Sequence, residues 1–196
     1  MSLNNRKLDL GCSFHKREGF VGIDILRANG IDIQADACFL PFKDNAFDEV
    51  YSSYALEHIQ DNLKVIQELW RVCEHGAIVR LVLPHFSNPA FYDDLTHRHK
   101  YSTRTFEHYD HDFHKITGHP NYLPEVNLKV EKAKLGWWPP QVIDRKILWK
   151  RSVLKILNRA INFLANRYPF LCERVWCNWV GGFYEVNFTV RVIKLR

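Results

Sequence analysis

The sequence predicts an α/β fold built on a mostly parallel sheet. Two patterns favour it: short apolar segments alternate with loops and one amphipathic helix in the first half, and a segment of period two closes the chain. With 196 residues, 46% of them hydrophobic, the chain is long enough for one well-buried core and short for two. We therefore expect a single domain over residues 1–196.

Seven segments have the composition of strands. The first two are apolar enough for burial on both faces, as in a parallel sheet. Apolar side chains at helical spacing predict a helix over residues 56–72, with Gly76 as its stop signal. The segment "YEVNFTVRV" alternates apolar and polar residues, so the last strand is expected to be half-exposed and antiparallel. The predicted strands span residues 6–10, 20–25, 31–35, 47–53, 77–83, 128–135 and 184–192.

A helical insertion, predicted to form a lid over residues 136–182, precedes the last strand. It starts with the Trp137-Trp138-Pro139-Pro140 turn, which suits a core or lid position, with stacking on a sugar ring as an open alternative. An amphipathic helix follows and ends before Pro169. One face carries Arg151, Lys155, Asn158, Arg159, Asn162 and Asn166, and another carries Leu154, Leu157, Ile161 and Leu164.

Charge is distributed unevenly along the chain. The formal net charge is +5, from 27 basic and 22 acidic residues. Residues 141–196 contain eleven basic and three acidic residues, whereas the first 140 contain sixteen and nineteen. This asymmetry indicates a surface for phosphates, anionic lipid or another anionic partner, and a solvated basic face is the alternative.

The cysteines and the apolar segments bear on the compartment. Five cysteines without a C-x-x-C pair are typical of free thiols in a reducing cytosol. The N-terminus lacks a signal-peptide pattern, and no apolar run approaches the ~18 residues of a membrane span. We expect a cytoplasmic protein, with peripheral contact between its basic helices and the inner membrane surface left open. The cysteines are Cys12, Cys38, Cys73, Cys172 and Cys177.

The stretch "LDLGCSFHKREGFVGIDI" has the features of half a nucleotide site. Ligands of open parallel sheets bind beyond the carboxyl ends of the strands. Gly11 follows the first strand, where a missing side chain lets the backbone approach a ligand. Asp24 ends the second strand and can accept from both ribose hydroxyls, and Asp36 follows the third, near an adenine amino group. No G-x-G-x-x-G is present, and twelve residues between Gly11 and Asp24 are too few for a full crossover helix.

Four segments together resemble a known family: "LDLGC", "GFVGIDI", "QADACFLPFKDNAFDEVYSSYALEHI" and "ELWRVCEHGAIVRLVLP". In order and spacing they are similar to class I S-adenosylmethionine-dependent methyltransferases of the small type 11 kind, and more closely to a subgroup often encoded beside polysaccharide and cell-surface glycan genes. The resemblance covers roughly residues 8–106. It implies a Rossmann-like, doubly wound, mostly parallel seven-stranded sheet with an antiparallel last strand, and S-adenosyl-L-methionine as cofactor. The chain departs from the family at Ser13, which stands at the second glycine position, and in its shortened first crossover.

The resemblance also implies which residues contact the cofactor. The set comprises Asp9, Gly11 and Cys12 for the methionine moiety, Asp24 and Ile25 for the ribose and adenine, Asp36 and Ala37 for the adenine edge, and Ser52, Ser53 and Tyr54 facing the sulfonium and the nucleophile.

A hydroxyl acceptor must also lose its proton during methyl transfer. Candidate proton acceptors near the expected cleft are His58, Asp94 and His97, with His85 also close. His58 follows the fourth strand, where capping or packing is the alternative role. Asp94 and His97 lie in the loop that, in the family, closes over the acceptor.

No metal is expected from these patterns. Some metal-assisted methyltransferases carry E-x-x-E-H after the fourth strand, but Tyr54 stands at the first glutamate position here. The run "HYDHDFHKITGH" (108–119) contains good zinc or manganese ligands, yet its spacing is irregular, so an exposed polar loop is favoured.

The resulting functional prediction is O-methylation of a glycan or a glycan precursor, by in-line transfer from S-adenosyl-L-methionine. The acceptor rests on family association alone. A methyltransferase-fold binding or scaffold protein with weak or lost activity is one alternative, and another small-molecule methyltransferase is a second. Nucleic acid is the least favoured acceptor, because "SSYA" lacks an N-P-P-Y type of motif. The sequence leaves the oligomeric state open.

Overall fold

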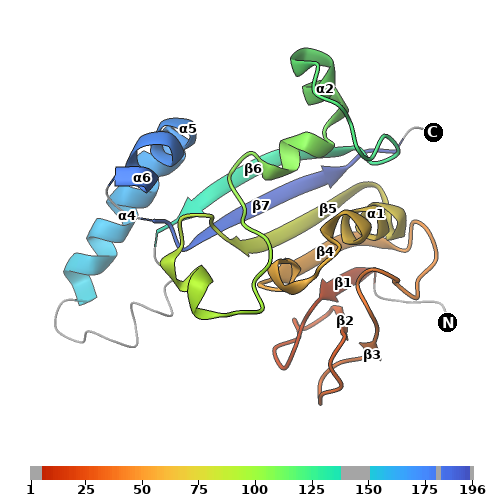
Figure 1. The fold of residues 1–196 in the computed structure, drawn as a ribbon. Helices are drawn as coiled ribbons and strands as arrows, with labels where there is room; N and C mark the ends of the chain where they lie inside the picture. The colour runs from red at the N-terminus through yellow and green to blue at the C-terminus, as the bar shows by residue number, and fades with distance from the viewer. Residues whose placement is uncertain (1–5, 138–150, 180–181, 195–196) are drawn as a thin grey trace.

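A single seven-stranded sheet, in the order β3-β2-β1-β4-β5-β7-β6, organises the computed structural model (Figure 1). The structure describes residues 6–137, 151–179 and 182–194. β1 to β5 pair in parallel, and β7 lies antiparallel between β5 and β6. The predicted α/β fold with its antiparallel last strand is confirmed. The strands are β1 (Lys7–Leu10), β2 (Val21–Asp24), β3 (Ile33–Gln34), β4 (Phe47–Ser53), β5 (Cys73–Pro84), β6 (Leu128–Gly136) and β7 (Glu185–Val192).

The helices follow the predicted pattern with differences at their ends. The helix expected over residues 56–72 is two elements, because the Asp61 side chain accepts from the backbone N–H of Lys64 and starts a new helix there. The stop predicted at Gly76 is wrong: the second helix ends at Val72, and Gly76, at φ +84°, lies within β5 where its pairing with β4 shifts register. The elements are η1 (Leu56–His58), α1 (Asn62–Val72), η2 (Pro89–Asp93), η3 (Thr105–Tyr109), α2 (His111–Thr117), α4 (Arg151–Arg167), α5 (Pro169–Leu171), η4 (Cys172–Trp176) and α6 (Cys177–Trp179).

One face of the sheet carries most of the core. β7 alternates as predicted, with its apolar side chains buried and its polar ones half-exposed. α1 packs its buried Val65, Ile66 and Leu69 on the same face. β1 and β2 are joined by a loop rather than a helix, so the shortened crossover is confirmed. Arg17 belongs to this loop, and its guanidinium lies 3.5 Å from the centre of the Tyr51 ring.

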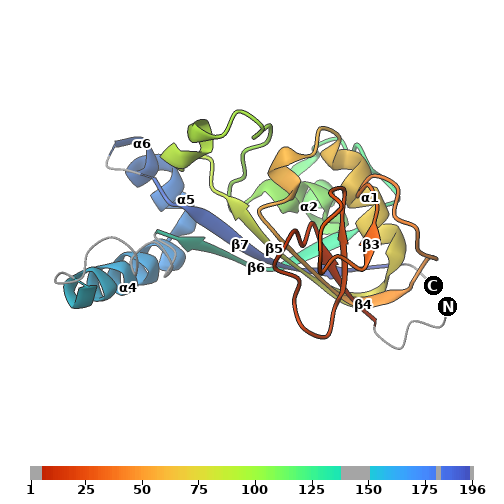
Figure 2. The same ribbon diagram turned by 90° about the horizontal axis from the view of Figure 1, so that it is seen from below.

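The helical segment α4–α6 extends from the end of the sheet, away from α1 (Figure 2). α4 meets the edge strand β6 through its polar stripe: Asn162 accepts from Trp137 N–H, and Asn166 both accepts from and donates to the Leu135 backbone. These amides satisfy backbone groups of an edge strand that has no further strand beside it. The polar face of α4 therefore contacts β6, while Ala165 is buried and Phe163 is 71% exposed.

A buried polar network attaches this helical segment to the body. Glu173 of η4 accepts hydrogen bonds from the backbone and hydroxyl of Thr103 at 2.6 and 2.9 Å, and it lies 3.0 Å from His85 Nε2. The other His85 nitrogen lies 2.7 Å from Ser87 Oγ. Residues 138–140 of the predicted Trp-Pro turn lie outside the described residues. No helix in the described ranges is long and apolar enough to cross a membrane.

Candidate functional site

The turn after β1 brings the backbone of Gly11 against the loop after β4. Gly11 has φ +68°, and a Cβ built on it would lie 2.3 Å from the Cβ of Ala55. Ser13 also adopts a positive φ, 46°. The sequence predicted a glycine here to admit a ligand. The structure shows a second requirement, which is packing against Ala55.

Asp24 lies at the tip of β2, half-exposed, where the predicted ribose site begins. Each of its carboxylate oxygens accepts one backbone N–H at 2.9 Å, from Ser13 and from Leu26. A carboxylate offers about four lone-pair positions. Two therefore stay available for the hydroxyls of a ribose.

Asp36 and exposed apolar side chains lie beside this tip. Asp36, exposed in the turn after β3, accepts from Cys38 N–H at 2.8 Å. Ile25 is 65% exposed and Phe39 is 71% exposed. Large apolar side chains exposed around two carboxylates are suited to a ligand with a flat apolar ring and hydrogen-bonding edges.

Other predicted cofactor residues lie in the interior. Asp9 is nearly fully buried and accepts from Arg17 N–H at 2.7 Å, and burial raises its pKa. Burial also raises the pKa of the Cys12 thiol to about 11, with a smaller effect from Asp9. Ser52 is fully buried and donates its hydroxyl to the Leu10 carbonyl. In this conformation these three side chains hold the strands and loop together.

Tyr54 follows β4 at φ +52° and spans toward β7. Its hydroxyl donates to the Glu185 carboxylate, and its ring lies 6.4 Å from that of Tyr184. Burial, followed by the bond to Glu185, raises the pKa of Tyr54, so the phenol stays protonated at neutral pH. Ser53 precedes it at the end of β4, and Ala37 follows Asp36 in the turn after β3.

A polar cluster lies directly after β4, where η1 meets the loop after β5. Glu57, His58 and His97 each offer one potential ligand atom, and these three atoms lie within 4.8 Å of one another. Glu57 is fully buried, and neither of its carboxylate oxygens has a hydrogen-bond partner. Burial, with a smaller effect from Asp94, raises the pKa of Glu57 to about 7. The segment "ALEHI" contains Glu57, but its sequence gives no sign that the carboxylate is buried and unpaired.

The hydrogen bonds around the two imidazoles assign their tautomers. His58 Nδ1 lies 2.7 Å from Thr96 Oγ1, whose own proton goes to the Asp94 carboxylate. His97 Nδ1 lies 3.0 Å from the Phe91 carbonyl oxygen. Both Nδ1 atoms therefore donate, and both Nε2 atoms keep a lone pair. Burial, followed by the neighbouring His97, lowers the pKa of His58, which favours the neutral ring near pH 7.

Hydrogen bonds to backbone carbonyls of η1 and the residues after it hold the loop after β5 beside this cluster. Arg98 N–H donates to the Glu57 carbonyl at 2.7 Å, and His99 Nε2 lies 3.1 Å from the Gln60 carbonyl. The predicted candidates His58, Asp94 and His97 are thus neighbours. His85 is not, because it is fully buried against Glu173.

The histidine-rich segment 108–119 folds partly into α2. Both ring nitrogens of His114 face backbone carbonyl oxygens, of His119 at 3.0 Å and His108 at 2.8 Å. Across the described ranges, the group at Glu57 is the only set of three His, Cys, Asp or Glu side chains close enough to hold a metal ion.

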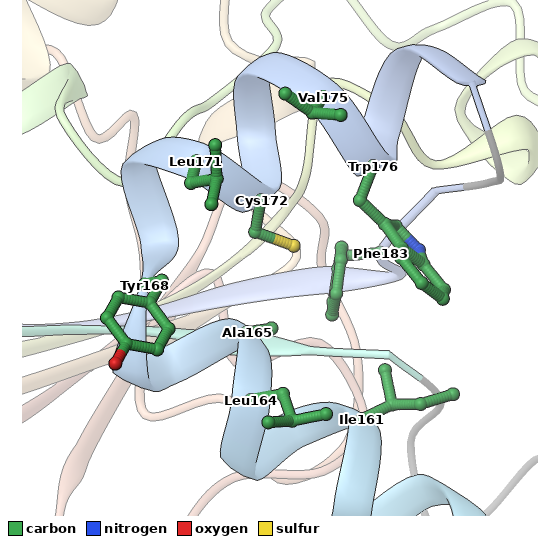
Figure 3. A pocket seen from close by; sticks show the side chains of 9 residues that line it. All are labelled: Ile161, Leu164, Ala165, Tyr168, Leu171, Cys172, Val175, Trp176 and Phe183. Atoms are coloured by element: carbon green, nitrogen blue, oxygen red, sulfur yellow. The ribbon is translucent and has the colours of Figure 1, made fainter.

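An apolar pocket of about 310 Å³ lies between α4, η4 and Phe183, the residue before Tyr184 (Figure 3). Tyr184 links this region to Tyr54, because the two rings are in contact. Because Glu185 pairs with Pro84, Phe183 and the pocket lie near the end of the sheet where β5 ends, which is also the end that carries the polar cluster. It is lined by Ile161, Leu164, Ala165, Tyr168, Leu171, Cys172, Val175, Trp176 and Phe183.

Comparisons with known proteins point to methyltransferases. Residues 16–81 match the family model described as "Methyltransferase domain". A ubiquinone/menaquinone biosynthesis C-methyltransferase of Haemophilus ducreyi is 40% identical over 76 residues, which cover 36% of this chain and 29% of that protein. A demethylmenaquinone methyltransferase of Renibacterium salmoninarum is 38% identical over 74 residues, or 37% of this chain and 30% of that protein. The match thus spans about a third of the length of these curated relatives.

Solved structures resemble the whole described fold at low identity. The YcgJ protein of Bacillus subtilis has a TM-score of 0.53 at 16% identity, covering 98% of this chain and 93% of that one. Phosphoethanolamine N-methyltransferase 2 of Haemonchus contortus, solved with S-adenosyl-L-methionine, has a TM-score of 0.53 at 19% identity, covering 97% and 49%. These similarities establish the fold.

Proposed function

We propose that this chain is a class I methyltransferase that transfers a methyl group from S-adenosyl-L-methionine to a small-molecule acceptor. Its fold and the match of residues 16–81 to the methyltransferase-domain family support this proposal. The observation that carries the proposal is the tip of β2. There a half-exposed carboxylate keeps two free lone-pair positions beside exposed apolar side chains. The family match covers this tip and Asp36.

The described residues fit the adenosine part of the cofactor. Asp24 would hold the ribose hydroxyls, Ile25 would pack on the adenine, and Asp36 with the backbone of Ala37 would meet the adenine edge. When bound, S-adenosyl-L-methionine supplies an electrophilic methyl group. The chain's part is to align an acceptor with it, since in-line transfer depends chiefly on orientation.

In the proposed reaction, the cluster of Glu57, His58 and His97 after β4 removes the proton of the acceptor hydroxyl. His58 Nε2 has a free lone pair on a ring that is neutral near pH 7, so it can take a proton from an acceptor hydroxyl. Asp94 holds that ring in position through Thr96. We propose His58 as the proton acceptor and Asp94 as a positioning residue.

The apolar pocket supports an acceptor with a substantial apolar part. Its lining is almost entirely hydrocarbon and aromatic (Figure 3), and it lies near the end of the sheet where β4 and β5 end. The relatives named above include quinone C-methyltransferases rather than glycan-modifying enzymes. The glycan acceptor and the contact with an anionic membrane stay predictions, and a polar sugar alone would leave this pocket unused.

Calorimetry with S-adenosyl-L-homocysteine tests the cofactor site. Asp24→Asn should weaken binding by about 100-fold, because hydrogen bonds to a charged group contribute about 1.5–3 kcal/mol each. Asp48→Asn, at the opposite end of the sheet, is the matched control and should bind normally. Equal binding by both variants would overturn the assignment of Asp24.

A labelled methyl donor tests catalysis. Incubated with extracted small molecules and lipids, the protein should label a product, and His58→Ala should label less with unchanged cofactor affinity. Binding without transfer to any fraction would instead favour the methyltransferase-fold binding protein.

A further inference from the structure

The Glu57 carboxylate has no partner in the site described above. It is fully buried and both oxygens lack hydrogen bonds. Buried charged groups in folded proteins are paired, protonated or bound to an ion, because burial without compensation is costly. The residues around Glu57 indicate which of these three states, paired, protonated or ion-bound, applies to its carboxylate.

Two imidazoles with the chemistry of ligands lie near this carboxylate. The Nε2 atoms of His58 and His97 both keep a lone pair, since each Nδ1 proton is used elsewhere. The potential ligand atoms lie within 4.8 Å of one another. Metal–ligand bonds of about 2.0–2.2 Å would draw them together by roughly 1 Å.

The surrounding hydrogen bonds match those of metal-binding histidines. Such histidines usually donate their second ring N–H to a carbonyl, a carboxylate or a hydroxyl, which fixes the ring. Here His97 donates to the Phe91 carbonyl, and His58 donates to Thr96, which donates to Asp94. Asp94 also brings a second negative charge, with its Oδ2 4.0 Å from His97 Nε2.

We propose that Glu57, His58 and His97 bind one divalent transition-metal ion. Two imidazoles and one carboxylate suit zinc, manganese and iron(II), and three protein ligands leave a coordination position open. The sequence argued against a metal because Tyr54 replaces the first glutamate of the E-x-x-E-H pattern. The proposed site does not use position 54, so Tyr54 does not exclude it. Its third ligand comes from the loop after β5, which the Arg98–Glu57 backbone bond holds in place.

Metal binding is measured without methyl transfer, although it uses the same His58 Nε2 lone pair that the proposed function assigns to the proton acceptor. With the ion bound, His58 coordinates the cation rather than accepting a proton. The competing account is a protonated Glu57 that needs no ion. The two differ in whether the purified chain takes up a stoichiometric ion.

The experiment uses protein prepared without a histidine tag, stripped with a chelator and dialysed against zinc or manganese. Elemental analysis should find one ion per chain, and cobalt(II) should give the visible absorption of a nitrogen- and oxygen-ligated site. His97→Ala should weaken binding by at least about 100-fold, and Thr96→Val by about 10- to 100-fold, because it removes only the outer partner of His58. His108→Ala, in the histidine-rich segment, is the matched control and should bind like the wild type.

Three results would overturn the proposal. One is less than one ion per chain at saturating zinc and manganese. Another is binding kept in His97→Ala and lost in His108→Ala, which would place the ion in segment 108–119. The third is a metal-free wild type that Glu57→Gln stabilises, which would establish a protonated carboxyl. Thr96→Val decides the question if His97→Ala does not fold.

Discussion

Glu173 is expected to be the main attachment of the helical segment α4–α6 to the sheet. Its carboxylate is 8% exposed and meets three polar groups, the Thr103 backbone and hydroxyl and the His85 ring. Glu173→Ala leaves a buried N–H, a buried hydroxyl and a buried imidazole without their acceptor. Removing one partner of such a network costs about 3–5 kcal/mol.

For a domain of this size that cost corresponds to a melting temperature lower by roughly 10 °C. Urea unfolding gives the free energy, and limited proteolysis within α4–α6 reports detachment before global unfolding. Glu131→Ala is the matched control: this exposed carboxylate pairs with Arg191 and should cost less than about 1 kcal/mol. A Glu173→Ala protein within about 1 kcal/mol of the wild type, with an unchanged cleavage pattern, would refute the reasoning.

The same network predicts a pH dependence. Burial alone raises the pKa of Glu173, but hydrogen bonds from His85 and Thr103 outweigh it and hold this pKa below its usual 4.5. A lowered folded-state pKa gives stability that is present above 4.5 and is lost as the pH falls through the lower folded value. The stability difference between wild type and Glu173→Gln should therefore shrink below pH 4.5. A difference that grew on acidification would contradict this.

Three further predictions follow from local geometry. Gly11→Ala should cost at least about 2 kcal/mol in urea unfolding, because it combines a left-handed backbone with a Cβ 2.3 Å from that of Ala55; a neutral effect would mean that the turn relaxes freely. Asn166→Ala should cost about 1–3 kcal/mol and speed amide exchange at Leu135, whose backbone loses both side-chain partners; unchanged exchange would argue against edge capping. Cys12, with its pKa raised to about 11, should react with thiol reagents at pH 8 only after unfolding, and fast labelling of the native protein would contradict its burial.

The segments that form strands were predictable because strand formation depends on the local sequence pattern. The order of the strands in the sheet was only partly predictable. The alternation in residues 184–192 indicates one buried face whatever the neighbours are, and β7 has that face. That β7 inserts between β5 and β6 is a long-range pairing, which no local period contains. β3 also shows the limit, since it contains only Ile33–Gln34 of the strand predicted over residues 31–35.

For the site, position in the chain was predictable and side-chain direction was not. Asp24 was expected at the tip of β2 and lies there, because a strand's last residue is set by the turn after it. Ser52 lies one residue before the end of β4, yet the pleat turns its side chain inward to the Leu10 carbonyl. Glu57 and His97 are 40 positions apart and become neighbours through one backbone hydrogen bond of Arg98.

The short connection between β1 and β2 explains why the glycine motif is reduced. With no crossover helix to organise the turn, carboxylates hold its backbone: Asp9 accepts from Arg17, Asp24 from Ser13, and Asp32 from Gly22. Ser13 at the second glycine position is therefore compatible with the fold, because its N–H bonds to Asp24 rather than to a ligand. Under the proposed function, Asp24 would serve two purposes, ordering the loop and holding the ribose. Cofactor affinity and loop order should be coupled in this protein, and a substitution at Asp24 should change both together.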